Sequence, residues 1–147
     1  MEAALSITRL LDAPRELVFE VWTNPDHLAK WWGPIGYTAT SCTINLAEGG
    51  GWRTCMRDWA GAEHWARGTY REIAAPERLV FSLAWEEPAG VPGRDMLVTV
   101  TFADRDGKTE MTFRQVGFES VEDRASHSVG WQECLDKLAD YLAGDGR

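Results

Sequence analysis

The sequence predicts an α+β domain in which a seven-stranded, curved antiparallel sheet faces one long C-terminal helix. Three observations predict it. Segments with alternating apolar and polar residues fill the middle of the chain, turn residues separate these segments, and the final segment carries an apolar stripe at helical spacing. Two short helices are expected between the first two strands. Because 147 residues are one domain's worth, we expect a single domain over residues 1–147.

The N-terminal part predicts a strand and then the two short helices. Residues Ala4–Leu11 alternate in the way a strand requires. Pro14 stands where a first helical residue belongs, and apolar residues follow it at helical spacing. Asn24-Pro25 ends this helix and begins the next, because Asn accepts from free amides and Pro fits the first turn. Gly33-Pro34 ends the second helix.

Six more strands are expected, at about 37–46, 51–58, 62–73, 78–86, 96–103 and 109–116. Turn residues separate them, namely Gly49-Gly50-Gly51, Trp59-Ala60-Gly61, Pro76 and Asp106-Gly107. Residues Glu87–Gly93 contain two prolines and two glycines, which indicates a longer and more mobile connection.

A long helix is predicted from about Val121 to Ala143. Ser120 can cap its start, and Gly144 stands where a C-terminal cap belongs. Gly130 in its interior costs roughly 1 kcal/mol relative to Ala, which favours a close approach to the sheet or to a ligand. Because one helix cannot cover seven curved strands, we expect a void between helix and sheet.

Composition and charge exclude several classes of function. The chain carries 15 basic against 23 acidic residues, a net charge of −8, which repels phosphate backbones and anionic lipid headgroups. We therefore expect no nucleic-acid partner and no membrane partner. No apolar run approaches the roughly 18 residues of a membrane span, and the start lacks a basic segment before an apolar one, so a cytoplasmic location is expected.

Neither a metal site nor a cofactor is expected. The three cysteines, an odd number without CxxC spacing, are interpreted as small buried hydrophobes, with a reactive thiol as the alternative. The three histidines lie too far apart in sequence for paired metal ligands. No Gly-rich phosphate loop and no GxSxG motif is present.

Several motifs together resemble a known family. They are Asp12-Ala13-Pro14-Arg15-Glu16-Leu17-Val18-Phe19, then Trp22, Pro25 and Trp31-Trp32-Gly33-Pro34, Gly50-Gly51, Gly68-Thr69-Tyr70-Arg71-Glu72-Ile73, Pro76-Glu77-Arg78-Leu79, and Gly130-Trp131 before Leu135 and Leu138. This combination, spread over nearly the whole chain, resembles the homologues of the activator of the heat-shock-protein-90 ATPase, a branch of the SRPBCC superfamily.

The resemblance implies a helix-grip (START-like) fold with an internal cavity, but not one activity. Members of the superfamily include chaperone co-activators, lipid or polyketide binders, aromatases, cyclases and self-sacrificing resistance proteins. The eukaryotic chaperone activators carry a further N-terminal domain for which this chain has no room, so a chaperone partner is a weaker expectation.

Strand alternation predicts which residues face the cavity. Asp58 is expected to pair with Ala62 across a three-residue turn, which sets three pairs opposite one another: Trp52 and Gly68, Thr54 and Ala66, and Met56 and His64. The candidate ligand-binding residues are Trp32, Trp52, Met56, His64, Tyr70, Phe81, Trp85, Met96, Phe113, His127 and Trp131, with Gln115 as a further polar point. Each has an alternative interpretation, since tryptophans and methionines also serve as core packing.

Three functions remain open at this point. The leading one is binding of a hydrophobic or aromatic small molecule in the cavity. The second is an enzyme of cyclase, aromatase or lyase type, with His64 or His127 as the catalytic acid–base. The third is a protein-interaction role like chaperone co-activation. Homodimerisation through an exposed strand edge or Trp59 is a further alternative.

Overall fold

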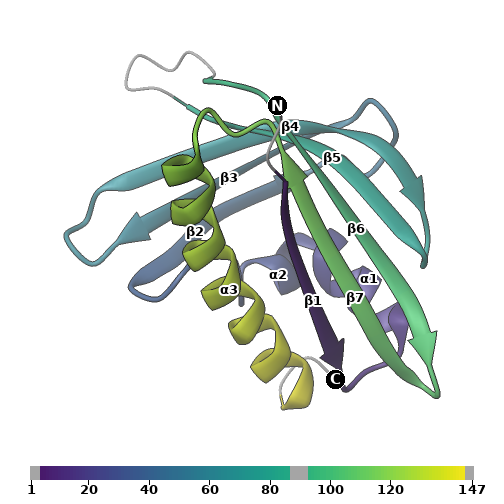
Figure 1. The fold of residues 1–147 in the computed structure, drawn as a ribbon. Coiled ribbons are helices and arrows are strands. Elements are labelled where there is room, and N and C mark those ends of the chain that lie inside the picture. Colours follow the sequence, from purple (N-terminus) through teal and green to yellow (C-terminus); the bar gives the residue numbers. More distant parts are fainter. Residues whose placement is uncertain (1–3, 87–92, 145–147) are drawn as a thin grey trace.

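The computed structural model describes residues 4–86 and 93–144 and shows one curled sheet wrapped around a long helix (Figure 1). The strands are β1 (Leu5–Leu11), β2 (Tyr37–Ile44), β3 (Gly51–Asp58), β4 (Glu63–Ala74), β5 (Arg78–Trp85), β6 (Met96–Arg105) and β7 (Lys108–Val116). They form one sheet in the order β1-β7-β6-β5-β4-β3-β2, and every neighbouring pair is antiparallel. The predicted α+β helix-grip architecture is confirmed.

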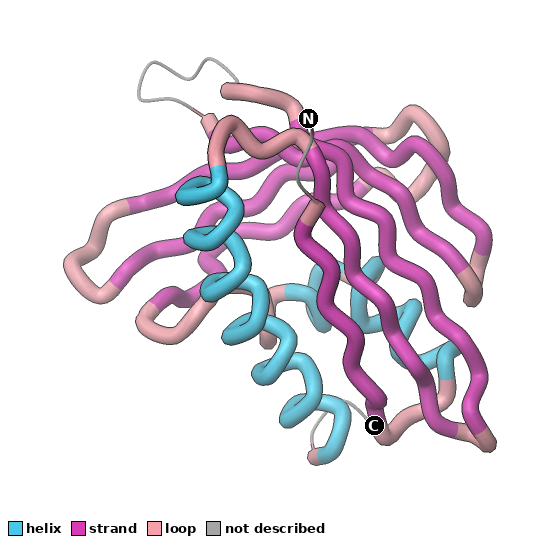
Figure 2. Tube along the Cα trace, viewed as in Figure 1, coloured by secondary structure: helices cyan, strands magenta, loops and turns pink. Residues whose placement is uncertain are grey.

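Three helices lie on the concave side of the sheet. α1 (Arg15–Thr23) and α2 (Pro25–Leu28) connect β1 to β2, and α3 (Val121–Ala143) runs across the open side of the curl (Figure 2). The Asn24 side chain accepts the amide of Asp26 at 2.9 Å, and the Ser120 side chain accepts the amide of Asp123 at 3.0 Å, so both predicted caps are confirmed. α3 begins and ends at the predicted residues.

The largest difference between predicted and observed strands is at the β6–β7 hairpin. β6 continues to Arg105 and β7 begins at Lys108, so the hairpin is longer than expected. The reason is the two-residue turn itself, because Asp106 and Gly107 both take positive φ angles, of 54° and 87°. Such a turn follows the twist of the two strands and lets pairing continue up to it.

The predicted β3–β4 register is confirmed, with Trp52 opposite Gly68, Thr54 opposite Ala66 and Met56 opposite His64. Gly68 is required at its position, because a Cβ there would lie 1.8 Å from the backbone oxygen of Ser82. The Trp52 indole covers this glycine and donates its N–H to the same oxygen at 3.1 Å.

Tryptophans form the centre of the core. Trp31 is fully buried and donates its indole N–H to the backbone oxygen of Val21 at 3.2 Å. The Trp22 ring lies 4.6 Å from that of Trp31 and 6.4 Å from that of Trp131, measured between centroids. Most of the space between α3 and the sheet is therefore filled by side chains.

Two further expectations from the sequence concern the connection at Glu87–Gly93 and membrane-spanning segments. Most of the predicted connection at Glu87–Gly93 lies outside the described residues. Within residues 4–86 and 93–144, none of the helices has the length and apolar character to cross a membrane.

Candidate functional site

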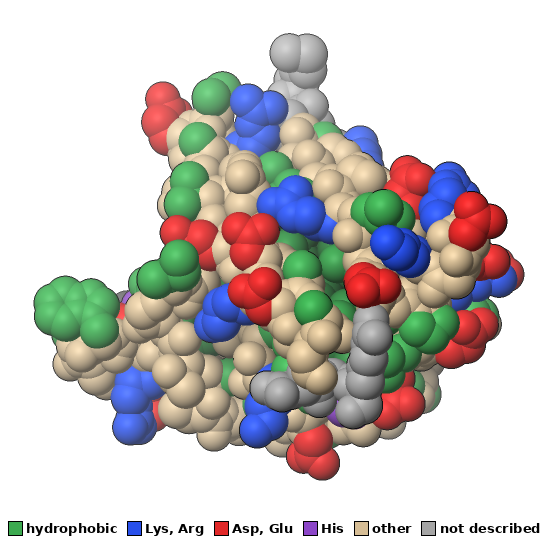
Figure 3. Space-filling model, turned by 90° about the horizontal axis from the view of Figure 1, so that it is seen from below, with side chains coloured by type: hydrophobic (Ala, Val, Ile, Leu, Met, Phe, Trp, Pro, Cys, Tyr) green, Lys and Arg blue, Asp and Glu red, His purple; other side chains and the backbone are tan. Residues whose placement is uncertain are grey.

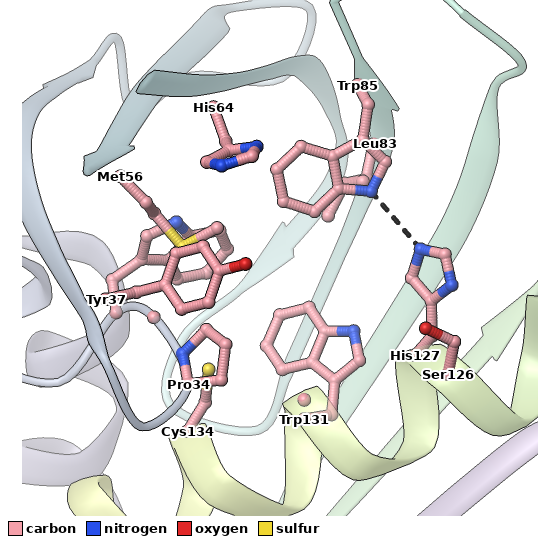
Figure 4. A pocket seen from close by; sticks show the side chains of 13 residues that line it. Pro34, Tyr37, Met56, His64, Leu83, Trp85, Ser126, His127, Trp131 and Cys134 are labelled. Carbon is pink, nitrogen blue, oxygen red and sulfur yellow. Dashed lines mark hydrogen bonds between the residues drawn. The ribbon is translucent and has the colours of Figure 1, made fainter. Parts of the chain in front are cut away.

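A cavity of about 290 Å³ lies at one end of the concave side, between the N-terminal half of α3 and the β3–β4 hairpin (Figure 4). Its walls come from α3, from the segment between α2 and β2, and from the inward faces of β3, β4 and β5. The lining residues are Trp32, Gly33, Pro34, Tyr37, Met56, His64, Leu83, Trp85, Ser126, His127, Gly130, Trp131 and Cys134. Mainly apolar walls with a few polar groups are typical of small-molecule sites.

The structure brings together some of the predicted ligand-binding residues and separates others. Six of the eleven line this cavity: Trp32, Met56, His64, Trp85, His127 and Trp131. The other five do not line it: Trp52, Tyr70, Phe81, Met96 and Phe113.

Met96 and Phe113 face inward as the alternation predicts, but other side chains fill the space in front of them. The Phe113 ring lies 4.4 Å from that of Trp131, between centroids. Gln115, the further polar point, is fully buried and donates to the Met96 sulfur at 3.2 Å, so it too belongs to the core and not to the cavity.

Trp52, Tyr70 and Phe81 surround a separate inner void of about 10 Å³, room for one water molecule at most. Trp32 lies between this void and the cavity, because it lines both. Burial raises the pKa of Tyr70 far above its usual range, so its hydroxyl stays neutral. These three residues therefore lie behind Trp32 and do not line the larger cavity.

Residues 33–37 form a wall that the sequence prediction missed. Gly33 has a φ of 116°, and a Cβ there would lie 3.2 Å from the Met56 sulfur. The Lys137 ammonium on α3 donates to the Gly33 backbone oxygen at 2.8 Å, and the Ile35 amide donates to the Glu133 carboxylate at 3.1 Å. The loop is thus held against α3, and no periodic pattern in a loop could have placed Pro34 beside the cavity. Tyr37 is the first residue of β2, and Lys137 also donates to its backbone oxygen, at 3.5 Å.

Cys134 and Gly130 also line the cavity and could have been found from helical spacing. Cys134 follows Trp131 by three residues and His127 by seven, which places all three on one helix face. A Cβ on Gly130 would lie 4.0 Å from Pro34 Cγ, so the glycine keeps space open between the helix and the loop. Burial raises the pKa of the Cys134 thiol to about 11, which keeps it protonated at neutral pH.

His64 is held at the cavity by a carboxylate. Its Nε2 atom lies 3.0 Å from Oδ2 of Asp58, and 40% of the His64 side chain is exposed. The hydrogen bond from His64, followed by that from the Ala62 amide, lowers the pKa of Asp58. Because an ionised carboxylate only accepts, Nε2 must carry the hydrogen. Nδ1 of a neutral His64 is then an acceptor, and no described residue donates to it.

His127 has both ring nitrogens occupied. The Trp85 indole donates to Nε2 at 3.2 Å, drawn as the dashed line in Figure 4. An indole nitrogen only donates, so Nε2 is the acceptor and the hydrogen is on Nδ1, which lies 2.9 Å from the Asp123 backbone oxygen. His127 thus joins α3 to the end of β5 through its imidazole ring.

The remaining polar chemistry is limited. Among the described residues, no group of three or more His, Cys, Asp and Glu side chains has the geometry to hold a metal ion. His27, the third histidine, contacts the Tyr141 hydroxyl at 2.7 Å and Glu20 at 3.3 Å, away from the cavity lining. The cavity therefore presents aromatic surface, the oriented imidazole of His64, and the hydroxyls of Tyr37 and Ser126.

Comparison with solved structures shows the same architecture in bacterial proteins. A crystal structure from Chromobacterium violaceum has a TM-score of 0.85 at 26% identity, over 97% of this chain and 98% of that one. A solution structure from Arthrobacter aurescens has a TM-score of 0.87 at 25% identity, over 98% and 89% of the two chains. An AHSA1-like protein from Aeromonas hydrophila has a TM-score of 0.79 at 27% identity, over 98% and 94%.

No curated protein matches the sequence. Residues 12–143 match the family described as activator of Hsp90 ATPase homolog 1-like protein. This match covers every strand except β1, and it covers all of α3. The relatives of this kind are part of the SRPBCC superfamily. The chain belongs to the activator of Hsp90 ATPase homolog 1-like family.

Proposed function

We propose that this protein binds a small aromatic or hydrophobic molecule in the cavity beside α3. The observation that carries the proposal is the cavity itself, about 290 Å³ lined by Trp32, Trp85, Trp131 and other mostly apolar groups. An engineered apolar cavity of about 150 Å³ is enough for benzene in another protein. The space here fits a guest of one or two rings.

Edge and face contacts with indoles supply much of the expected affinity. Trp85 and Trp131 lie on opposite walls, on β5 and α3, so a planar guest between them can contact both (Figure 4). Aromatic pairs contribute about 0.5–1.5 kcal/mol each beyond the burial of apolar area. Flexible Met56 can adjust to the outline of the guest.

His64 supplies the polar recognition in this proposal. Its Nδ1 is available as an acceptor because Asp58 occupies Nε2. A guest with a hydroxyl or N–H at one end would donate to Nδ1 while its rings contact the indoles. Phenols, naphthols and hydroxyindoles have this chemistry, and we expect them to bind better than the parent hydrocarbons.

The test is a titration of the protein with 2-naphthol and naphthalene, followed by amide chemical shifts and by calorimetry. We expect saturable binding of 2-naphthol, with shifts at Trp85, Trp131 and His64. Gly130→Leu should abolish binding by filling the space opposite Pro34, whereas Val129→Leu, on the exposed side of α3, should leave it unchanged. Absence of saturable binding by either compound to the folded protein would refute the proposal.

Acid–base catalysis in the same cavity is a second candidate, favoured by the Asp58–His64 pair. A histidine oriented by a carboxylate, with its other nitrogen directed toward a guest, is the usual arrangement of a general base. His127 is unsuited to this role because both nitrogens are already bonded. Incubation of each binding compound with the protein, followed by mass and isomer analysis, tests for turnover. The His64→Gln variant should show no turnover, whereas the His127→Gln variant should remain active.

Activation of the Hsp90 ATPase, the role in the family's name, is a third candidate. Adding the protein to purified Hsp90 and measuring ATP hydrolysis tests it directly. A rise in hydrolysis that Gly130→Leu leaves unchanged would separate this role from use of the cavity.

A further inference from the structure

A groove lies on the outer, convex face of the sheet, on the side opposite the cavity. It is a groove of about 460 Å³ over β3, β4 and β5, and we call it the arginine groove after Arg53, Arg67 and Arg71. Side chains alternate between the two faces of each strand, so these arginines point away from Met56, His64 and Trp85. The groove is thus separate from the site of the proposed function.

The charges in the groove are unbalanced. Arg53 and Arg67 are directly opposite one another in the β3–β4 register, an arrangement of like charges that is destabilising in isolation. Glu86 is occupied by Arg53, which donates to both carboxylate oxygens at 2.7 and 2.9 Å. The Arg53 guanidinium also lies 3.8 Å above the Trp65 ring.

Arg67 is left without a comparable partner. It is half-buried, yet it forms no hydrogen bond or ion pair with any described residue. The positive charge of Arg67 acts on Glu86. Together with the hydrogen bond from Arg53, it lowers the pKa of the Glu86 carboxyl. Among the described residues that line the groove, Asp95 is the one carboxylate, so with Glu86 counted, three guanidinium groups face two described carboxylates. This local positive charge occurs on a chain with a net charge of −8.

The backbone makes room for a ligand in the groove. Gly51 lies on its floor, and the nearest atom to a Cβ there would be the Gly68 oxygen at 3.7 Å. Arg71 is at a register irregularity between Tyr70 and Glu72, where β4 carries an extra residue relative to β5. Such a bulge redirects its side chain, and Arg71 lines the groove with one contact, to the Thr69 hydroxyl at 3.4 Å.

We propose that the arginine groove binds a small soluble molecule that carries a diphosphate group. Guanidinium groups bind phosphoryl oxygens through paired, charge-assisted hydrogen bonds. Arg67 and Arg71 are four residues apart on one strand, about 13 Å along the backbone, with the Thr69 hydroxyl between them. Two adjacent phosphoryl groups present enough acceptors for both arginines and the hydroxyl, and their negative charge compensates the surplus.

On the face shown in Figure 3, acidic and basic side chains are interspersed. Arg78 and Arg105 illustrate the usual pattern, since each is paired with one carboxylate, Glu72 at 3.0 Å and Glu110 at 2.8 Å.

The experiment is a titration of the folded protein with inorganic pyrophosphate at physiological ionic strength, followed by amide chemical shifts. We expect saturable shifts at Gly51, Gly68 and Thr69 and none at the cavity residue Trp131. Arg67→Gln and Arg71→Gln should each weaken binding at least tenfold.

Arg105→Gln is the matched control. Arg105 is also paired with one carboxylate, and it lies at the far end of β6, ten residues from Asp95 and so about 30 Å along the strand from the groove, beyond the reach of screened charge. It should change the affinity less than twofold. If all three variants weakened pyrophosphate binding equally, the attraction would be to net charge alone. If the shifts did not saturate, pyrophosphate would not bind at a site. Either result would overturn the proposal. Pyrophosphate binding that survives Gly130→Leu separates this result from that of the proposed cavity function.

Discussion

A single carboxylate, that of Asp58, orients His64 and closes the turn between β3 and β4. Oδ2 lies 3.0 Å from Nε2 of His64, while Oδ1 accepts the amides of Ala60 at 3.0 Å and Ala62 at 2.9 Å. The direction of the imidazole at the cavity is therefore coupled to the geometry of the hairpin tip.

Asp58→Asn should reduce stability in a pH-dependent way. The pKa of Asp58 is lowered in the folded protein, so its contribution is complete above the ordinary carboxyl pKa and is lost as the pH falls through the lower folded value. Urea unfolding of the two proteins between pH 7 and pH 2 should show a gap that is constant near neutrality and narrows in acid. A gap that widens in acid would contradict this assignment.

His127→Ala should destabilise the fold by about 1 kcal/mol, because the Trp85 indole loses its acceptor and α3 loses its link to the end of β5. Denaturant unfolding measures this loss. His127→Gln keeps an acceptor at this position and should recover part of the stability. An identical midpoint for His127→Ala and wild type would show that the contact contributes nothing.

Gly130→Ala should stabilise the protein by up to about 1 kcal/mol, a rise in melting temperature of about 2–4 °C. The added methyl group meets only Pro34 Cγ, at 4.0 Å, so no clash offsets the gain in helix propensity. Differential scanning calorimetry provides the measurement. A lower melting temperature would mean that the loop of residues 33–37 requires the free space.

Gly68→Ala should destabilise by roughly 3 kcal/mol or more, because its Cβ would lie 1.8 Å from the Ser82 oxygen and 2.7 Å from the Trp52 indole nitrogen. Gly61→Ala is a useful comparison, since Gly61 has a φ of 89° but no atom within 4 Å of a Cβ. We expect a smaller loss there, from backbone strain alone. Chemical denaturation of both variants separates crowding from strain.

Cys134 should resist alkylation in the native protein. With a pKa of about 11, roughly one thiol in ten thousand is ionised at pH 7, against a few per cent for an ordinary cysteine. Iodoacetamide treatment followed by peptide mass mapping should show slow labelling of Cys134 until urea is added. Rapid labelling of Cys134 under native conditions would show that the reagent reaches the thiol, and so that the cavity is more open than its lining residues indicate.

The fold was predictable because its signals are local and repeated. The caps at Asn24 and Ser120, the Asp106-Gly107 turn and the pairing of Trp52 with Gly68 each follow from residue chemistry within a few positions. The cavity was predictable only in part, because alternation tells which face a side chain occupies and not whether another side chain fills the space before it. Phe113 faces inward, but Trp131 lies against it.

The loop contribution had no signal of that kind. Pro34 reaches the cavity because Lys137 and Glu133 hold the loop before β2 against α3, and those contacts span about a hundred residues. The difference between the two histidines was equally hidden, since it depends on which partner each ring nitrogen meets in space.

The ring contacts among the tryptophans have an optical consequence. The Trp32 ring lies 5.9 Å from those of Trp31 and Trp52 and 5.4 Å from that of Trp131, and Trp22 adjoins Trp31. Excited-state energy passes readily between chromophores at such separations, so these five indoles emit as one antenna. A guest that contacts Trp131 alone would therefore quench the fluorescence of all five indoles. The emission of the buried tryptophans would thus report whether the cavity is occupied.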